Sequence, residues 1–271
     1  MTTNNTLKGL RVLVCRPGEK AAGLVARLTE AGAQVRSLPT LSIEAVPEQD
    51  QAVKQAVMSL DRFQHVIFIS ESAARFGADW IDRYWPQLPL GIQWYAIGDK
   101  TARTVRRLLP LSEQEIQQPV DGIDSEALVQ LPGLQGSLAN ESVLIFRGVG
   151  GRPHLGEALA GRGAKICYAQ VYRRVQPEYS EGDLRRDLSE FDPHLLVCLS
   201  AETANNLSGL AERVRFDLST KSFIMPSKRA VEECVWLSSA HCIIPKGLAE
   251  SDIAFSINAW WQPRDFIKVG E

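Results

Sequence analysis

Side chains that carry a hydroxyl recur where apolar, strand-like runs turn into helix-like segments. In an open α/β sheet such turns lie at the carboxyl ends of the strands, where the N–H groups of helix N-termini bind carboxylates or phosphates. Each hydroxyl is also suited to cap a helix by accepting a backbone N–H, a role that needs no ligand. The pattern predicts an anion-binding crevice, with helix capping as the alternative at each position. The positions are Ser70, Ser72, Thr101, Ser200, Thr203 and Ser227.

Three arginines accompany these turns. Arg16 and Arg147 end equivalent strand-like runs, and Arg152 follows in a glycine-rich turn that begins at Gly148. This turn is not a dinucleotide fingerprint, because Pro153 occupies the position of the third glycine. A guanidinium can hold a carboxylate of a ligand through two parallel hydrogen bonds. The alternative is an arginine that is solvated or paired with a neighbouring carboxylate of the protein.

Tyr172 lies in an extended segment of alternating residues that follows the second strand–helix–strand unit. A phenol with an ordinary pKa of about 10 stays protonated at neutral pH, so Tyr172 is a candidate proton donor. The alternative is that its ring only packs at a junction between domains.

Histidines and cysteines give little sign of chemistry. None of the 4 histidines recurs at an equivalent position in the two halves of the chain. The 5 cysteines lie mostly in apolar runs, without a C-x-x-C pair or a histidine at metal-ligand spacing. We expect buried, reduced thiols, with a redox or metal role as the alternative.

Length and composition limit the class of protein. A chain of 271 residues with 45% apolar residues has enough core material for two domains. A net charge of −2 argues against a partner held by phosphate neutralisation, so we expect no nucleic acid and no membrane surface as partners. The first residues lack a signal-peptide pattern, and no apolar run is long enough for a membrane span. We therefore expect a cytoplasmic protein.

The chain contains an internal repeat. The segment from Val12 to Pro47 matches the segment from Val143 to Pro177, with VL-x-x-R aligned to VL-x-x-R at a constant separation of about 130 residues. Each copy reads as strand, glycine-containing turn, helix, strand and extended connector. Further strand-to-helix units follow each copy, which predicts an α/β fold with two similar three-layer domains and parallel sheets.

The two extended connectors occupy equivalent places in the repeat. This placement is expected if the chain crosses between the domains twice, so that the connectors pair as a two-stranded β-ladder linker. The prediction is a discontinuous first domain of residues 1–37 and 178–271, a second domain of residues 47–167, and linker strands at 38–46 and 168–177. Two simple tandem domains are the alternative.

Taken together, six motifs resemble the uroporphyrinogen-III synthase family of tetrapyrrole biosynthesis, over nearly the whole chain from Leu10 to Trp261. The motifs are VLVCRP, FISESAA, AIGDKTA, VLIFRGVGGR followed by VYRR, CLSAETANNL and MPSKRA. Because each motif is weak alone, their order and spacing carry the resemblance. The resemblance implies two α/β domains of flavodoxin-like topology joined by a two-stranded ladder.

The resemblance also implies a cofactor-free lyase. Its substrate would be hydroxymethylbilane, a linear tetrapyrrole with eight carboxylate side chains, which is cyclised with loss of water and inversion of ring D through a spiro intermediate. Tyr172 matches the family's connector tyrosine, and we expect it to assist departure of the hydroxyl.

Ser70, Thr101, Ser200 and Ser227 match the family's cleft hydroxyls. We expect a monomer; the alternative function is a non-catalytic two-domain binder of a small anionic metabolite. The complete set of expected substrate-binding residues is Arg16, Ser70, Ser72, Thr101, Arg147, Gly148, Arg152, Ser200, Thr203 and Ser227.

Overall fold

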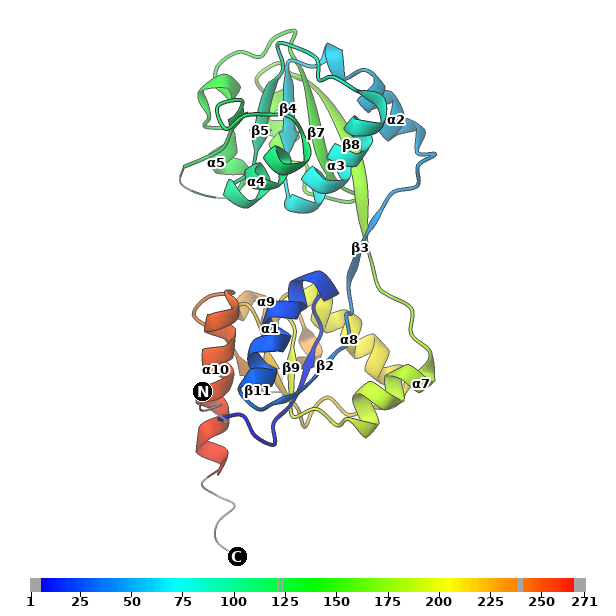
Figure 1. Ribbon diagram of the computed structural model, residues 1–271, viewed down its shortest axis with the longest axis vertical. Coiled ribbons are helices and arrows are strands. Elements are labelled where there is room, and N and C mark those ends of the chain that lie inside the picture. The colour runs from blue at the N-terminus through cyan, green and yellow to red at the C-terminus, as the bar shows by residue number, and fades with distance from the viewer. Residues whose placement is uncertain (1–5, 121, 123, 238–240, 266–271) are drawn as a thin grey trace, which may run out of the picture. The chain divides into compact units, whose positions relative to one another are not determined.

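The computed structural model describes residues 6–120, 122, 124–237 and 241–265. The chain divides into two compact units, each considered by itself (Figure 1). Unit 1 comprises Met1–Ser42 and Val175–Glu271, and unit 2 comprises Ile43–Arg174. The chain therefore leaves unit 1 once and returns to it once. The predicted domain limits and the predicted linker role of the two crossings stay predictions.

Unit 1 is built on a five-stranded sheet in the order β11-β10-β9-β1-β2, with every pair of neighbours parallel. Its strands are β1 (Arg11–Val14), β2 (Gln34–Ser37), β9 (Leu195–Val197), β10 (Ser222–Ile224) and β11 (His241–Ile243). Its helices are α1 (Gly18–Glu30), α7 (Glu181–Leu184), η3 (Arg185–Glu190), α8 (Ala201–Arg213), α9 (Lys228–Glu232), η4 (Val235–Leu237) and α10 (Glu250–Asp265).

Unit 2 is built on a six-stranded sheet in the order β3-β8-β7-β4-β5-β6, in which β8, β7, β4, β5 and β6 are parallel neighbours. Its strands are β3 (Ser42–Ala45), β4 (His65–Phe68), β5 (Gln93–Ala96), β6 (Ile116–Gln117), β7 (Ser142–Gly148) and β8 (Lys165–Val175). Its helices are α2 (Gln51–Met58), η1 (Leu60–Arg62), α3 (Glu71–Tyr84), α4 (Asp99–Leu108), α5 (Ser125–Leu128), η2 (Pro132–Leu134) and α6 (His154–Ala160).

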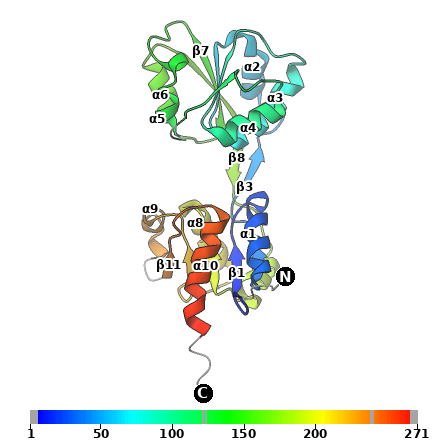
Figure 2. The same cartoon turned by 60° about the vertical axis from the view of Figure 1, so that its left-hand side comes forward.

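Each sheet has an apolar core on both faces. In β4, Val66 and Phe68 pack with α2, α3 and α4, while Ile67 packs on the opposite face with α5 and α6. Figure 2 shows these two groups of helices on either side of the sheet. All four residues of β4 are buried, which explains why its sequence shows no polar alternation. Unit 1 likewise packs α1 and α10 on one face, and α7, α8 and α9 on the other. The predicted α/β fold with parallel sheets is confirmed.

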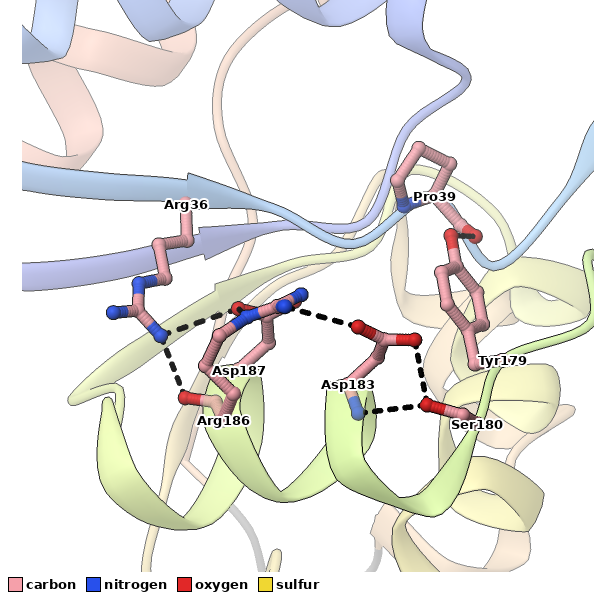
Figure 3. Close-up of polar contacts among 7 residues, drawn as sticks. All are labelled: Arg36, Pro39, Tyr179, Ser180, Asp183, Arg186 and Asp187. Carbon is pink, nitrogen blue, oxygen red and sulfur yellow. Dashed lines mark hydrogen bonds and ion pairs between the residues drawn. The ribbon is translucent and has the colours of Figure 1, made fainter.

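The extended segment after α1 separates into two edge strands. Pro39 lies between β2, at the edge of the unit 1 sheet, and β3, at the edge of the unit 2 sheet. A proline cannot donate a ladder hydrogen bond, so it belongs at such a break. The helical segment after Val175 is not predicted by the sequence pattern; there α7 continues into the π-helical turns of η3 (Figure 3).

Candidate functional site

Tyr172 and Ser70 form a pair of hydroxyls in unit 2. The Oη atom of Tyr172 on β8 lies 3.2 Å from the Oγ atom of Ser70, and either hydroxyl can be the donor. Ser70 is the N-cap of α3 and accepts the backbone N–H of Ala73 at 3.0 Å. The ring of Tyr172 is 6% exposed and lies beside Phe76, with 6.1 Å between ring centres. The phenol is thus held by packing and by one hydrogen bond at the start of α3.

Gly148 sets the position of the Tyr172 ring. The ladder between β7 and β8 shifts register between Arg147 and Gly148, so that Gly148 faces Tyr172. A Cβ atom at Gly148 would lie 2.6 Å from the ring of Tyr172. The backbone N–H of Val149 also donates to the carbonyl of Tyr172 at 2.8 Å. Only glycine lets the two strands approach this closely without displacing the ring.

Arg147 lies beneath the glycine-rich turn and is 4% exposed. Its guanidinium carbon is 4.7 Å from the centre of the Tyr168 ring. Its Nε atom has no hydrogen-bond partner within the described part of the chain. The next residues turn away from the sheet through Gly150, which has a φ of +71° that favours glycine.

These residues converge on one pocket at the carboxyl end of β4 and β7. Its volume is about 550 Å³. It brings together five of the predicted residues: Ser70, Arg147, Gly148, Arg152 and Tyr172. Sequence reasoning missed Tyr168, Ser125, Arg174 and the apolar wall of the pocket. Tyr168 packs with the apolar cluster on the opposite face of the sheet from Tyr172, and the register shift of β8 lies between them. Period-two alternation along β8 therefore gives no signal that would have found Tyr168.

Ser72 and Thr101 do not line this pocket. Ser72 lies in the first turn of α3 and is half-buried. Thr101 lies in the first turn of α4 and is buried. Neither placement tests a role in substrate binding.

The remaining predicted hydroxyls belong to unit 1. Ser200 caps α8 by accepting the backbone N–H of Thr203 at 3.0 Å, and the two side-chain oxygens are 2.8 Å apart. Ser227 caps α9 by accepting the backbone N–H of Ala230 at 3.2 Å. Helix capping, the alternative left open by the sequence, is therefore present at Ser70, Ser200 and Ser227.

Arg16 follows β1 at the position equivalent to Arg147. It is half-buried, and burial lowers the pKa of its guanidinium, whereas the nearby carboxylate of Glu250 acts in the opposite direction. Arg16 therefore has an acidic side chain in its surroundings. Arg147 has no comparable acidic neighbour among the residues described.

The other candidate groups have structural environments. His65 is buried and hydrogen-bonded to Tyr95 and Glu141. Burial, followed by the charge of Glu141, raises the pKa of Tyr95 to about 12. All five cysteines are free thiols, and burial is the largest cause that raises the pKa of Cys167. Within the described ranges, no group of three or more His, Cys, Asp or Glu side chains is arranged to hold a metal ion.

No helix in the described part of the chain is long and apolar enough to cross a membrane.

The pocket of unit 2 has a cationic wall next to a pair of hydroxyls. Such a site can hold a carboxylate and can donate a proton to a leaving oxygen.

Comparisons with known proteins point to one family. The model of the family described as uroporphyrinogen-III synthase HemD matches residues 22–245. The uroporphyrinogen-III synthase of Escherichia coli K12 is 30% identical over 204 residues, which cover 74% of this chain and 80% of that protein. The enzyme of Salmonella typhimurium LT2 is 32% identical over 170 residues, covering 63% and 67%.

Solved structures of low sequence identity share the fold. A mutant uroporphyrinogen III synthase of Thermus thermophilus matches with a TM-score of 0.56 at 14% identity, covering 93% of this chain and 99% of that chain. The uroporphyrinogen-III synthetase of Helicobacter pylori 26695 matches with a TM-score of 0.52 at 14% identity, covering 92% and 99%.

Proposed function

The chain belongs to the uroporphyrinogen-III synthase HemD family, and we propose that the pocket of unit 2 holds the reacting part of the substrate. The enzyme cyclises hydroxymethylbilane to uroporphyrinogen III with loss of water and inversion of ring D. The alternative of a non-catalytic anion binder is not favoured, because the relatives are enzymes.

Tyr172 is the proton donor in this proposal. The leaving hydroxyl takes the phenol proton and departs as water, while the adjacent pyrrole nitrogen supplies the electron pair that forms the azafulvenium cation. Ring D then attacks through its substituted carbon to give the spiro intermediate. Fragmentation and reclosure at the other α-carbon release one proton, which restores the phenol.

The observation that carries this role is the pair of hydroxyls on the wall of the pocket, with the Oη atom of Tyr172 3.2 Å from the Oγ atom of Ser70. Ser70 already accepts the N–H of Ala73, so its own proton is free to point at Tyr172 or to relay a proton from it. The buried ring has little freedom to turn away from this contact. Holding the donor in one place favours ordered cyclisation over unassisted closure to the wrong isomer.

Replacing Tyr172 tests this role. Tyr172→Phe keeps the ring against Phe76 and removes only the hydroxyl. We expect kcat to fall about 10- to 100-fold, near the low end for general acids because the substrate also loses its hydroxyl unaided. The measurement is the rate of type III product formed from fresh hydroxymethylbilane, with the isomers resolved by chromatography.

The matched control is Tyr84→Phe, at the opposite end of α3 in the same unit. Its rate should equal that of the unchanged enzyme. An unchanged kcat in Tyr172→Phe would remove Tyr172 from the mechanism. Formation of only the type I isomer by the unchanged enzyme would contradict the function itself.

We also propose that the enzyme works as a cytoplasmic monomer. Each unit has its own apolar clusters on both faces of its sheet, so no second copy is needed to complete a core. Five free cysteines fit a reducing compartment. Light scattering during gel filtration should give a mass near 30.0 kDa, and a mass of twice that value would contradict the monomer.

A further inference from the structure

Arg147 is a buried cation that no carboxylate of the described chain neutralises. Its contact with the face of Tyr168 is favourable. That contact offsets only part of the unfavourable free energy of moving a charged guanidinium from water into the protein. Buried charges in proteins are normally paired, so the absence of a carboxylate partner for Arg147 among the described residues requires an explanation.

The surrounding backbone is shaped around this guanidinium. A Cβ atom at Gly151 would collide with the Nη2 atom of Arg147, and a Cβ atom at Gly156 would collide with the hydroxyl of Tyr168. One glycine thus makes room for the cation and the other for the ring beneath it. Arg147 is therefore a buried part of the pocket wall, in a space that the two glycines leave open.

The pocket that Arg147 helps to line is electropositive. Arg152 and Arg174 also contribute to the wall, and none of the described residues that line it is Asp or Glu. The hydroxyls of Ser70 and Tyr172 open onto the same space. A cationic wall without an internal acid is matched by an anionic group of a ligand.

We propose that Arg147 is the buried anchor of a carboxylate-binding subsite in unit 2, which receives one carboxylate side chain of the tetrapyrrole. This inference rests on the proposed use of the same pocket by the substrate. The carboxylate would accept hydrogen bonds from the guanidinium and so hold the tetrapyrrole in the pocket that Tyr172 also lines. Arg147 is a binding residue here and takes no part in proton transfer.

Arg147→Gln tests the subsite. The carboxylate is bound equally in the ground state and in the transition state, so its loss should act on KM. We expect KM for hydroxymethylbilane to rise at least about tenfold, with kcat within about twofold and type III product retained. Arg83→Gln is the matched control, because it removes the same charge at the far end of α3 and Arg83 is paired with Glu48.

Thermal unfolding separates binding from a structural role. An arginine that holds the fold together would lower the Tm when replaced. Because Arg147 lacks an internal partner among the described residues, Arg147→Gln should leave the Tm of the free enzyme unchanged or raise it. Arg147→Lys keeps the charge but loses the planar fork, so its KM should lie between those of the unchanged enzyme and Arg147→Gln.

A ligand titration identifies the anion. The octacarboxylate uroporphyrin should raise the Tm of the unchanged enzyme, and this shift should shrink in Arg147→Gln but not in Arg83→Gln. The octamethyl ester, which has no charge, should give no shift. Inorganic phosphate at the same concentration should give little shift; an equal, Arg147-dependent shift would assign the site to free phosphate and overturn the carboxylate proposal.

An unchanged KM in both Arg147 variants, or a lower Tm of the free Arg147→Gln enzyme, would overturn the subsite. These results leave the proposed function standing, since the unchanged enzyme would still form the type III isomer. Conversely, absence of type III product from the unchanged enzyme would remove the proposed function, whatever the variants do.

Discussion

In unit 1, Arg36 and Arg186 share the carboxylate of Asp187, whereas Arg147 in unit 2 faces an aromatic ring and the pocket. The Nη1 atom of Arg36 lies 3.2 Å from Oδ1 of Asp187, and Nη2 of Arg186 lies 3.0 Å from Oδ2 (Figure 3). Arg186 also reaches Asp183 at 2.9 Å. Both arginines of this cluster thus have an acid within contact distance.

The pairing of polar groups within the protein continues along the chain in unit 1. The Ser180 hydroxyl, followed by the charge of Arg186, keeps the pKa of Asp183 below its usual range. Tyr179, next to Ser180, donates its hydroxyl to the carbonyl of Pro39 at 2.8 Å (Figure 3). This network ties the segment that re-enters unit 1 to the connector after β2. Its polar groups are used within the protein, so the network is structural.

A structural arginine and a binding arginine differ here in their partners. A binding arginine would be expected to be more exposed than a structural one, but Arg147 is more buried than Arg36 and Arg186. The presence of an internal acid does: Arg36 and Arg186 have one, and Arg147 has none in the described chain. A second difference lies in the backbone, because the space around Arg147 and Tyr172 is made by glycines.

Gly148→Ala should have the largest effect. The added methyl would lie 2.6 Å from the Tyr172 ring, and the ring must move to relieve the contact. We expect a loss of about 1–3 kcal/mol in the free energy of unfolding, typical of overpacking. We expect kcat to fall at least about tenfold, because a displaced donor is badly aligned. Urea unfolding and the type III assay measure the two effects.

Gly209→Ala in unit 1 is the contrasting control. Gly209 lies within α8, and a Cβ atom there would meet nothing within 4 Å. Alanine should therefore stabilise the helix by about 0.5–1 kcal/mol without altering kcat. Equal effects of the two substitutions would show that the space around Gly148 is not specific to the Tyr172 ring.

Much of the fold follows from the sequence because its signals are local. The run His65–Phe68, in which three apolar residues follow His65 without alternation, predicts a strand covered on both faces, and all four residues are buried. The serines at the ends of such runs predict caps, and Ser70, Ser200 and Ser227 accept the expected N–H groups. Local hydrogen bonding and periodicity determine these features, so one sequence is enough to find them.

The pairing of side chains across strands is harder to predict. The contact of Arg147 with Tyr168 depends on the parallel register of β7 and β8, which places Tyr168 opposite Ile145, two residues before Arg147. Register is a tertiary property that no local pattern near Arg147 encodes. The π-helical turns after α7 are another example, since Arg36 from a distant segment forms an ion pair with Asp187 and donates to the carbonyl of Arg186.

Asp187→Asn should produce an intermediate effect confined to unit 1. The substitution leaves Arg36 and Arg186 without their shared carboxylate at a buried position. We expect a loss of about 1–2 kcal/mol in the free energy of unfolding, below the cost at a fully buried pair because both arginines are partly exposed. KM and kcat should not change. A KM that rises as in Arg147→Gln would mean that the paired cluster also takes part in binding, so that an internal acid would not distinguish the two kinds of arginine.

Asp192→Asn should produce the smallest effect, and one that depends on pH. A hydrogen bond from Lys221, with added charge from Lys221 and Arg11, lowers the pKa of Asp192 in the folded state. Its contribution is therefore present above the ordinary aspartate value of about 3.8 and is lost as pH falls below that value. Asparagine tolerates the left-handed φ of 46° at this position, so the change removes charge and keeps the backbone.

Urea unfolding of the two proteins at several pH values checks this expectation. At pH 7, Asp192→Asn should be less stable by about 0.5–1 kcal/mol, the scale of an ion pair that is half exposed. The difference should shrink steadily as pH falls below about 3.8, because protonated aspartate resembles asparagine. A difference that persists at the lowest pH would show that the ion pairs of unit 1 are not what stabilises this turn. In Arg147→Gln no such acid-dependent change should appear, since Arg147 has no carboxylate partner within the described residues.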